Sequence, residues 1–158
     1  MNKSARIIGA LAAAATIPLM TQGTAAAASA QQSFNINTQS GGTYAGYAKA
    51  SGWVSFGSRT RFNIGATVTD VCPKDGAGAY LWVQVDFRSA TTSTTGSWVS
   101  DASGCSDGSS GSTTRYDEGL IDDIVAVRVI VKECDTTSRC STNSMDIKYS
   151  AWKYNPYV

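Results

Sequence analysis

The sequence contains no histidine, and this absence excludes several kinds of active site. None of its 158 residues is a histidine. Hydrolases that use a histidine base, and metal sites that use imidazole ligands, are therefore excluded. No Walker or dinucleotide-binding motif is present either. We expect a protein that is not an enzyme and that has no cofactor.

Metal binding by other ligands has little support. No C-x-x-C pair occurs, so a thiolate zinc site is not predicted. The segment from Asp70 to Gly76 carries two carboxylates, Asp70 and Asp75, in a short loop, as many calcium sites do. The pair Asp75-Gly76 is also a common turn, and this explanation needs no ion. We therefore expect no metal site.

Glutamate is scarce, with two residues in the whole chain. A glycosidase built on an all-β fold needs two carboxyl groups that face one cleft. Acidic residues beside a hydrophobic strand usually serve turns and solubility instead. We expect no catalytic residue among the candidate carboxylates, which are Asp86, Asp117, Glu118, Asp122 and Asp123.

Long apolar runs are absent except at the N-terminus. Lys3 and Arg6 precede an apolar segment over residues 7–20, and Ala28-Ser29-Ala30 fits the small-x-small pattern of a cleavage site. The apolar segment is shorter than the roughly 20 residues that a membrane helix needs. We expect residues 1–30 to be a cleaved signal peptide and the protein to be secreted into the extracellular space.

A strong charge of either sign is also absent. Of the 13 lysine and arginine residues, Lys3 and Arg6 belong to the predicted signal peptide, so 11 basic residues would face 12 acidic ones in the mature chain. Scattered basic residues on a nearly neutral chain do not favour binding to nucleic acid or to an anionic membrane. We expect neither as a partner.

Four cysteines follow the signal peptide, at Cys72, Cys105, Cys134 and Cys140. An even number in an oxidising compartment predicts two disulfides. Three pairings are possible. We favour Cys134 with Cys140, which closes a short loop, and Cys72 with Cys105, which joins two longer loops.

The hydrophobic residues follow the two-residue period of β-strands. Apolar and polar residues alternate over 62–69, 80–87 and 124–133, and the last of these runs has an unbroken valine face. The first two runs flank a loop with Pro73, Gly76 and Gly78, which predicts a hairpin. Weaker strands are expected over 44–56, 97–100 and 146–154, and a long surface loop over 101–114.

These patterns predict an all-β fold. No helical period occurs after the signal peptide, which excludes a parallel α/β architecture. We expect a single antiparallel β-sandwich of about six or seven strands with two disulfides, and a small barrel as the second choice. This domain would span residues 43–158, a size that suits one hydrophobic core.

Residues 31–42 are polar and end in two glycines, so we expect an extended or disordered N-terminal arm. Phe34 and Ile36 are its exceptions, and their spacing places both on one face of a strand. Such a strand would add to a sheet edge, either in this chain or in a partner. The alternative is a frayed end with two incidental hydrophobic residues.

Aromatic side chains are the strongest binding signal. Trp53 and Trp82 fall on predicted outer faces of strands, where flat rings contact proteins or sugars. A second buried layer is the alternative, and we expect at least half of the candidate rings to be buried. The predicted partner contacts are Phe34, Ile36, Trp53 and Trp82.

We therefore predict a non-enzymatic binding protein that acts as an adaptor or interaction subunit of an extracellular protein complex. One alternative is a carbohydrate-binding module that uses the same rings on a glycan. Another is an inhibitor of an extracellular hydrolase that presents the loop over residues 101–114.

A resemblance supports this prediction. The segment VTDVCPKDGAGAY over residues 68–80, with VRVIVKEC over 127–134 and then Cys140, resembles a group of small secreted β proteins of filamentous bacteria. In size, export signal, cysteine number and polar mature N-terminus, the chain is also similar to the adaptor subunit of umbrella toxin particles. That resemblance implies a linker, within a toxin complex, between a lectin-like subunit and a repeat-containing stalk. It implies no site residue.

Overall fold

Ten β-strands and no helix are present in the described part of the chain. The computed structural model describes residues 29–71, 76–89, 92–102, 110–117, 120–136 and 138–158. Within these ranges no helix exists that could cross a membrane. The strands are β1 (Gln32–Asn37), β2 (Tyr47–Ser58), β3 (Arg61–Val71), β4 (Gly78–Phe87), β5 (Ser93–Asp101), β6 (Gly111–Asp117), β7 (Ile124–Thr136), β8 (Arg139–Cys140), β9 (Ile147–Tyr149) and β10 (Lys153–Tyr154).

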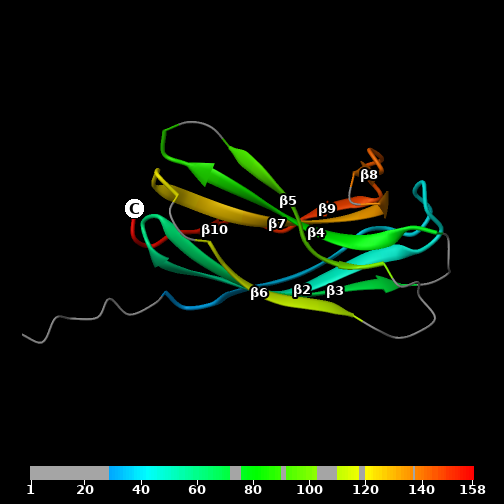
Figure 1. The fold of residues 1–158 in the computed structure, drawn as a ribbon, viewed down its shortest axis with the longest axis horizontal. Coiled ribbons are helices and arrows are strands. Elements are labelled where there is room, and N and C mark those ends of the chain that lie inside the picture. Colours follow the sequence, from blue (N-terminus) through cyan, green and yellow to red (C-terminus); the bar gives the residue numbers. More distant parts are fainter. Residues whose placement is uncertain (1–28, 72–75, 90–91, 103–109, 118–119, 137) are drawn as a thin grey trace, which may run out of the picture.

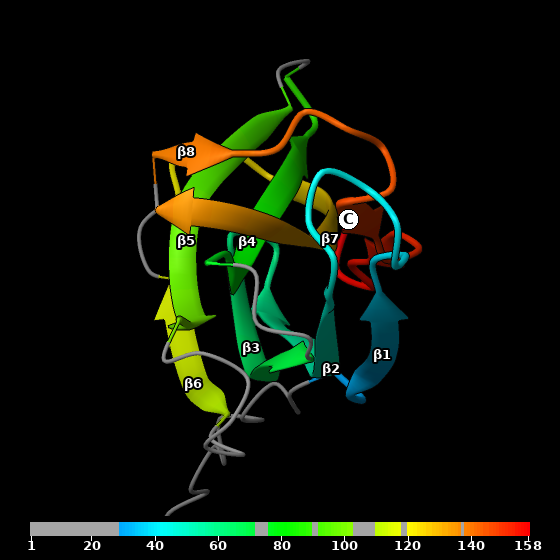
Figure 2. The same cartoon turned by 90° about the vertical axis from the view of Figure 1, so that its right-hand side faces the viewer.

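The strands form two antiparallel sheets that face each other as two layers (Figure 1). The first sheet has the order β1-β2-β3-β6. The second has the order β10-β7-β4-β5, and β8 and β9 also pair with β7. Figure 2 shows the first sheet with its strands in sequence from β1 at one margin to β6 at the other. The predicted all-β, antiparallel, sandwich-like architecture is confirmed, but the predicted six or seven strands are fewer than the ten of the described part, because the expected arm adds β1 and the two- and three-residue strands β8, β9 and β10 are too short to leave an alternating pattern.

The core lies between the two sheets and is built from the alternating residues. Phe56 and Phe62 of the first sheet and Leu81 and Val129 of the second are fully buried. Burying an aliphatic or aromatic side chain of this size contributes about 1.5–3 kcal/mol. Contact between the two apolar faces therefore holds the layers together.

The predicted hairpin between β3 and β4 is wrong. β3 pairs with β2 and β6 in the first sheet, whereas β4 pairs with β5 and β7 in the second. Alternation determines which side chains of a strand are buried, but a strand with one apolar face can complete either layer. The chain therefore crosses from one sheet to the other between Val71 and Gly78.

β1 belongs to the first sheet. Its six residues pair with β2 from Gln32 opposite Val54 to Asn37 opposite Lys49. Phe34 and Ile36 are 7% and 8% exposed and belong to the core. This part of the expected arm is thus ordered, and it adds to the sheet edge of its own chain.

β7 organises the second sheet. It pairs with β4 along one edge and with β8, β9 and β10 along the other. The valine pattern predicted the buried face correctly at Val127, Val129 and Val131, but at the start of the strand Ile124 is in the core and Val125 is only partly buried. Cys134 near the end of β7 forms the predicted disulfide with Cys140 of β8. The other predicted disulfide, between Cys72 and Cys105, lies outside the described residues.

Two strands lie partly in segments that were expected to be connections or loops. β5 begins at Ser93 and β6 begins at Gly111, in stretches rich in serine and threonine. Both strands lie at sheet edges, where the backbone bonds to one neighbour and few apolar side chains are needed. Threonine also suits a strand, so the low hydrophobicity of these stretches was misleading.

Candidate functional site

The four residues predicted to contact a partner are not brought together. Phe34 and Ile36 face the core and are unavailable to a partner. Trp53 is next to the buried Val54 on β2, and Trp82 lies between two buried core residues on β4. Because side chains alternate along a strand, both indoles lie on outer faces. These faces belong to different sheets.

Around Trp82, the outer face of the second sheet gathers aromatic and cationic side chains from β4, β7 and the C-terminal strands. Register places Gln84 opposite Arg128, and Ile130 between Trp82 and Tyr149. We call this surface the Arg128 face. Its residues are Trp82, Gln84, Arg128, Lys132, Tyr149 and Trp152.

The guanidinium of Arg128 packs against two aromatic rings. Its Cζ atom lies 4.5 Å from the ring centroid of Tyr149 and 4.5 Å from that of Trp152. Its Nε atom donates a hydrogen bond of 2.6 Å to Oε1 of Gln84. Cation–π contacts and the hydrogen bond together fix the plane of the guanidinium. Arg128 is therefore positioned before any ligand binds.

A second cation–π pair extends the face. The Nζ atom of Lys132 lies 4.2 Å from the ring centroid of Trp82. Burial lowers the pKa of Lys132, because the ammonium loses part of its hydration. Lys132 and Arg128 lie on the same side of β7, so two cations lie on one face of the sheet.

Below these side chains lies a small apolar layer. Tyr80, Ala126 and Ile130 are 5%, 1% and 2% exposed, although they point away from the central core. Register places Lys132 beside Tyr80, and Trp82 and Tyr149 on either side of Ile130. The expectation that at least half of the candidate rings would be buried is wrong, because Trp53 and Trp82 are only partly buried and Tyr80 is the one candidate ring in the buried class among the described residues.

A hollow adjoins the Arg128 face. It has a volume of about 420 Å³ and lies between Tyr149 and the segments that carry Gln39 and Met145. Tyr149 is 45% exposed and takes part in both the hollow and the Arg128 stack. The aromatic cluster around Arg128 thus lies directly beside this hollow.

Two carboxyl groups are buried at the end of β7. Glu133 and Asp146 are 2% and 0% exposed. Thr38 donates a hydrogen bond of 2.7 Å to Oε1 of Glu133, and Oδ2 of Asp146 accepts hydrogen bonds from the amide of Thr43 and the hydroxyl of Ser141. The two remaining oxygens, Oε2 and Oδ1, have no other partner.

A proton on Glu133, shared with Asp146, would satisfy both oxygens. Burial raises the pKa of Glu133 to about 7; the hydrogen bond from Thr38 lowers it, and the hydrogen bond and charge of Asp146 raise it by smaller amounts. Burial also acts to raise the pKa of Asp146, but hydrogen bonds from Ser141 and Thr43 outweigh this effect and lower it. Glu133 is therefore the protonated member. Since solvent does not reach either group, the pair serves the fold.

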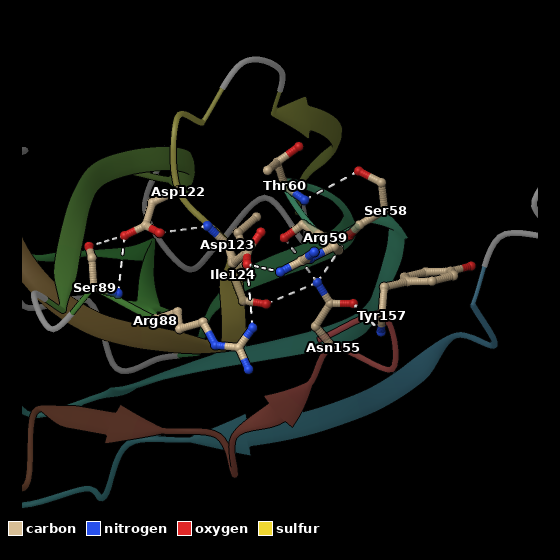
Figure 3. A network of polar contacts seen from close by, with 10 residues as sticks. All are labelled: Ser58, Arg59, Thr60, Arg88, Ser89, Asp122, Asp123, Ile124, Asn155 and Tyr157. Carbon is tan, nitrogen blue, oxygen red and sulfur yellow. Dashed lines mark hydrogen bonds and ion pairs between the residues drawn. The ribbon is translucent and has the colours of Figure 1, made fainter.

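The carboxylates considered for glycoside cleavage have other partners. Asp122 accepts hydrogen bonds from the backbone amide and hydroxyl of Ser89, and Asp123 forms ion pairs with Arg59 and Arg88 (Figure 3). Asp86 accepts a hydrogen bond of 3.4 Å from Thr92. These contacts connect loops and support the prediction that the acids serve turns. The side chains of Asp117 and Glu118 lie outside the described set.

The amide of Asn155 completes the same network. Its Nδ2 atom donates to the backbone oxygens of Ser58, Arg59 and Ile124 at 3.0, 3.3 and 2.9 Å (Figure 3). This one side chain joins the β2–β3 turn to the start of β7. The network is a structural connection between the sheets.

Two other expectations concern metals and inhibition. Among the described residues, no group of three or more acidic or cysteine side chains could hold a metal ion. Asp75 and half of the loop proposed for an inhibitor, residues 103–109, lie outside those residues.

The sequence prediction missed Arg128, Lys132 and Tyr149. A signal was present, because Arg128 and Lys132 interrupt the outer face of the strongest valine strand. Cations at such positions need nearby partners, and here those partners are the aromatic rings of Tyr149 and Trp82. The contribution of Tyr149 and Trp152 depends on the pairing of β9 with β7, which alternation does not reveal.

No protein family, curated protein or solved structure matches the chain.

Proposed function

We propose that this protein is a secreted, non-enzymatic binding protein, an adaptor or interaction subunit of an extracellular protein complex, and that the Arg128 face is its contact surface. The observation that carries this proposal is the packing of the Arg128 guanidinium against both Tyr149 and Trp152. Tryptophan, tyrosine and arginine are the residues most enriched at the energetic centres of protein interfaces.

Preorganisation supports the same assignment. A free arginine loses side-chain entropy on binding, at a cost of about 0.5–1.5 kcal/mol for an immobilised side chain. The two rings and Gln84 already hold Arg128 in place. Two rings and Gln84 already contact the guanidinium, so a ligand would reach the remaining N–H groups at its edge. A carboxylate fits such an edge through two parallel hydrogen bonds.

The charge of the face indicates the kind of partner. Arg128 and Lys132 contribute two positive charges, whereas Asp86 is the acidic residue on the same face of β4. We infer a protein partner that presents an aspartate or glutamate beside apolar groups. The predicted signal peptide and the disulfide Cys134–Cys140 support an oxidising, extracellular location.

The first experiment measures the mass of the native protein, purified gently from its own secretion medium. We expect a complex well above the mass of one chain, with a second polypeptide that co-elutes. Arg128→Ala should release the second polypeptide, and Arg128→Lys should weaken the complex, because lysine keeps the charge but loses the planar stack. Lys49→Ala, an exposed cation on the other sheet, is the matched control.

Two results would overturn the proposal. One is a monomer in the native medium. The other is a complex that Arg128→Ala leaves intact, provided that thermal unfolding shows the variant to be folded. If Lys49→Ala alone loses the complex, the contact surface lies on the first sheet and not on the Arg128 face.

A further inference from the structure

A shallow hollow lies on the outer face of the first sheet, and we call it the Trp53 trough. It spans three neighbouring strands, β2, β3 and β6, and has a volume of about 530 Å³. This volume lies within the range of roughly 300–1,000 Å³ that is usual for ligand sites. Two rows of paired positions form the trough. They are Ser51–Thr67–Ser112 and Trp53–Gly65–Thr114.

The indole of Trp53 lies over Gly65. A Cβ atom at Gly65 would stand 2.5, 2.7 and 2.7 Å from Cε2, Cζ2 and Nε1 of the indole. Because the atom would be almost equally far from three bonded ring atoms, the flat side of the indole faces the glycine. Only glycine leaves room for this arrangement. The opposite side of the ring therefore faces away from the sheet.

Hydroxyl groups line the trough beside the ring. Ser51, Thr67, Ser112 and Thr114 project from the same outer face as Trp53, since they occupy the same two rows. Each hydroxyl offers one donor and two acceptor positions. None of the residues that line the trough carries a charge.

We propose that the Trp53 trough binds a neutral polysaccharide with a flat, extended backbone, such as a β-linked glucan. A pyranose ring has an apolar face of C–H groups and a rim of hydroxyls. The face matches the outward side of the indole, and the rim matches the serine and threonine hydroxyls. Three strands at a spacing of about 4.8 Å give the trough the length of a disaccharide unit.

Other macromolecules fit this surface less well. A nucleic acid would need cations for its phosphates, and the lining has none. A protein partner would need a buried anchor or a charged pair at its centre, whereas the trough is open and neutral. The site also lies on the opposite layer from the Arg128 face and does not depend on it.

Affinity electrophoresis in native gels tests the proposal. The gels contain hydroxyethyl cellulose, soluble barley β-glucan, laminarin or soluble starch, one in each gel. We expect at least one of the first three to retard the protein. Trp53→Ala should lower the affinity more than about tenfold, as loss of a central aromatic contact does. Thr67→Val, which removes one exposed hydroxyl, should lower it about fivefold.

Two matched controls keep the result interpretable. Trp82→Ala removes the other outer-face indole, and Thr94→Val removes an exposed hydroxyl from β5 of the second sheet. Both should be retarded like the unaltered protein. Since the Arg128 variants should also be retarded normally, failure of this site and failure of the Arg128 face can be told apart.

The inference is wrong if none of the three β-glucans retards the unaltered protein, whether or not starch does. It is also wrong if Trp53→Ala is retarded as strongly as the unaltered chain. Retardation that Trp82→Ala abolishes and Trp53→Ala preserves would place a glycan on the second sheet and overturn the assignment to the trough.

Discussion

The carboxyl groups of Glu133 and Asp146 face each other inside the protein, and each leaves one oxygen for the other. Glu133 is at the end of β7, and Asp146 lies just before β9. Thr38, just after β1, donates to Glu133. The pair thus connects the margin of the first sheet to the second sheet, and its protonation state bears on the stability of the whole fold.

Stability should fall as pH rises from acidic to alkaline values. The pKa of Glu133 is about 7 in the folded protein, against an ordinary value of 4.5. The folded state therefore holds this proton more tightly than the unfolded state does. The stabilisation is complete below pH 4.5 and is lost as pH rises through 7. The melting temperature, measured from pH 5 to 9, should decrease across that interval.

Glu133→Gln is the control for this pH dependence. A glutamine amide donates to Asp146 at every pH, as protonated Glu133 does, so the melting temperature should become nearly constant from pH 5 to 9. An unaltered protein that melts at the same temperature at pH 5 and pH 9 would contradict the shared proton. So would an unchanged slope in Glu133→Gln.

Gly42→Ala should destabilise the protein. A Cβ atom at Gly42 would overlap the carboxylate of Asp146. The buried pair cannot move away without breaking its hydrogen bonds, so we expect a loss of about 1–3 kcal/mol in the free energy of unfolding. Urea denaturation measures this. Gly96→Ala is the matched control, because a Cβ atom there meets no neighbour, and it should change stability by less than about 0.5 kcal/mol.

Phe34→Ala should show that β1 is part of the fold. Phe34 is 7% exposed and packs in the core. Its truncation should cost about 3 kcal/mol, the lower end of the range for buried phenylalanine. Asn35→Ala, which changes the exposed neighbour on the same strand, should have almost no effect. Equal stability of the two variants in urea would mean that β1 is not anchored in solution.

Loss of the disulfide Cys134–Cys140 should be tolerated. The two cysteines are six residues apart. A cross-link that closes so short a loop removes little entropy from the unfolded chain, about 2 kcal/mol. The double variant Cys134→Ala/Cys140→Ala should therefore fold, with a free energy of unfolding lower by that amount. Failure of this variant to fold would show that the bridge is essential for the pairing of β7 with β8.

The sequence was sufficient to predict most strands and their buried faces, but not which strands pair with each other. Alternation identified Leu81 and Val129 as core residues, because burial on one face leaves a two-residue pattern. It did not separate β3 and β4 into different sheets. Pairing depends on which strands meet in space, and nothing in the local pattern of either strand encodes that.

For the candidate sites, too, the sequence predicted which face of a strand a side chain occupies but not which side chains meet. Trp53 and Trp82 were identified as outer-face residues, and both lie on outer faces. The contact of Arg128 with Tyr149 joins residues 21 positions apart in sequence, through the pairing of β9 with β7. The position of the Trp53 indole depends on Gly65 across the strand pair. Both relationships arise only when the sheets form.

β7 is the longest strand in the described part of the chain, with 13 residues, and its valine-rich sequence would aggregate readily if its edge were open. The chain covers that edge with three short pieces, β8, β9 and β10, of two, three and two residues. Another chain needs a longer uninterrupted row of free backbone groups to add a strand. The C-terminal segment therefore acts as a barrier to edge-to-edge association of β7 with other chains.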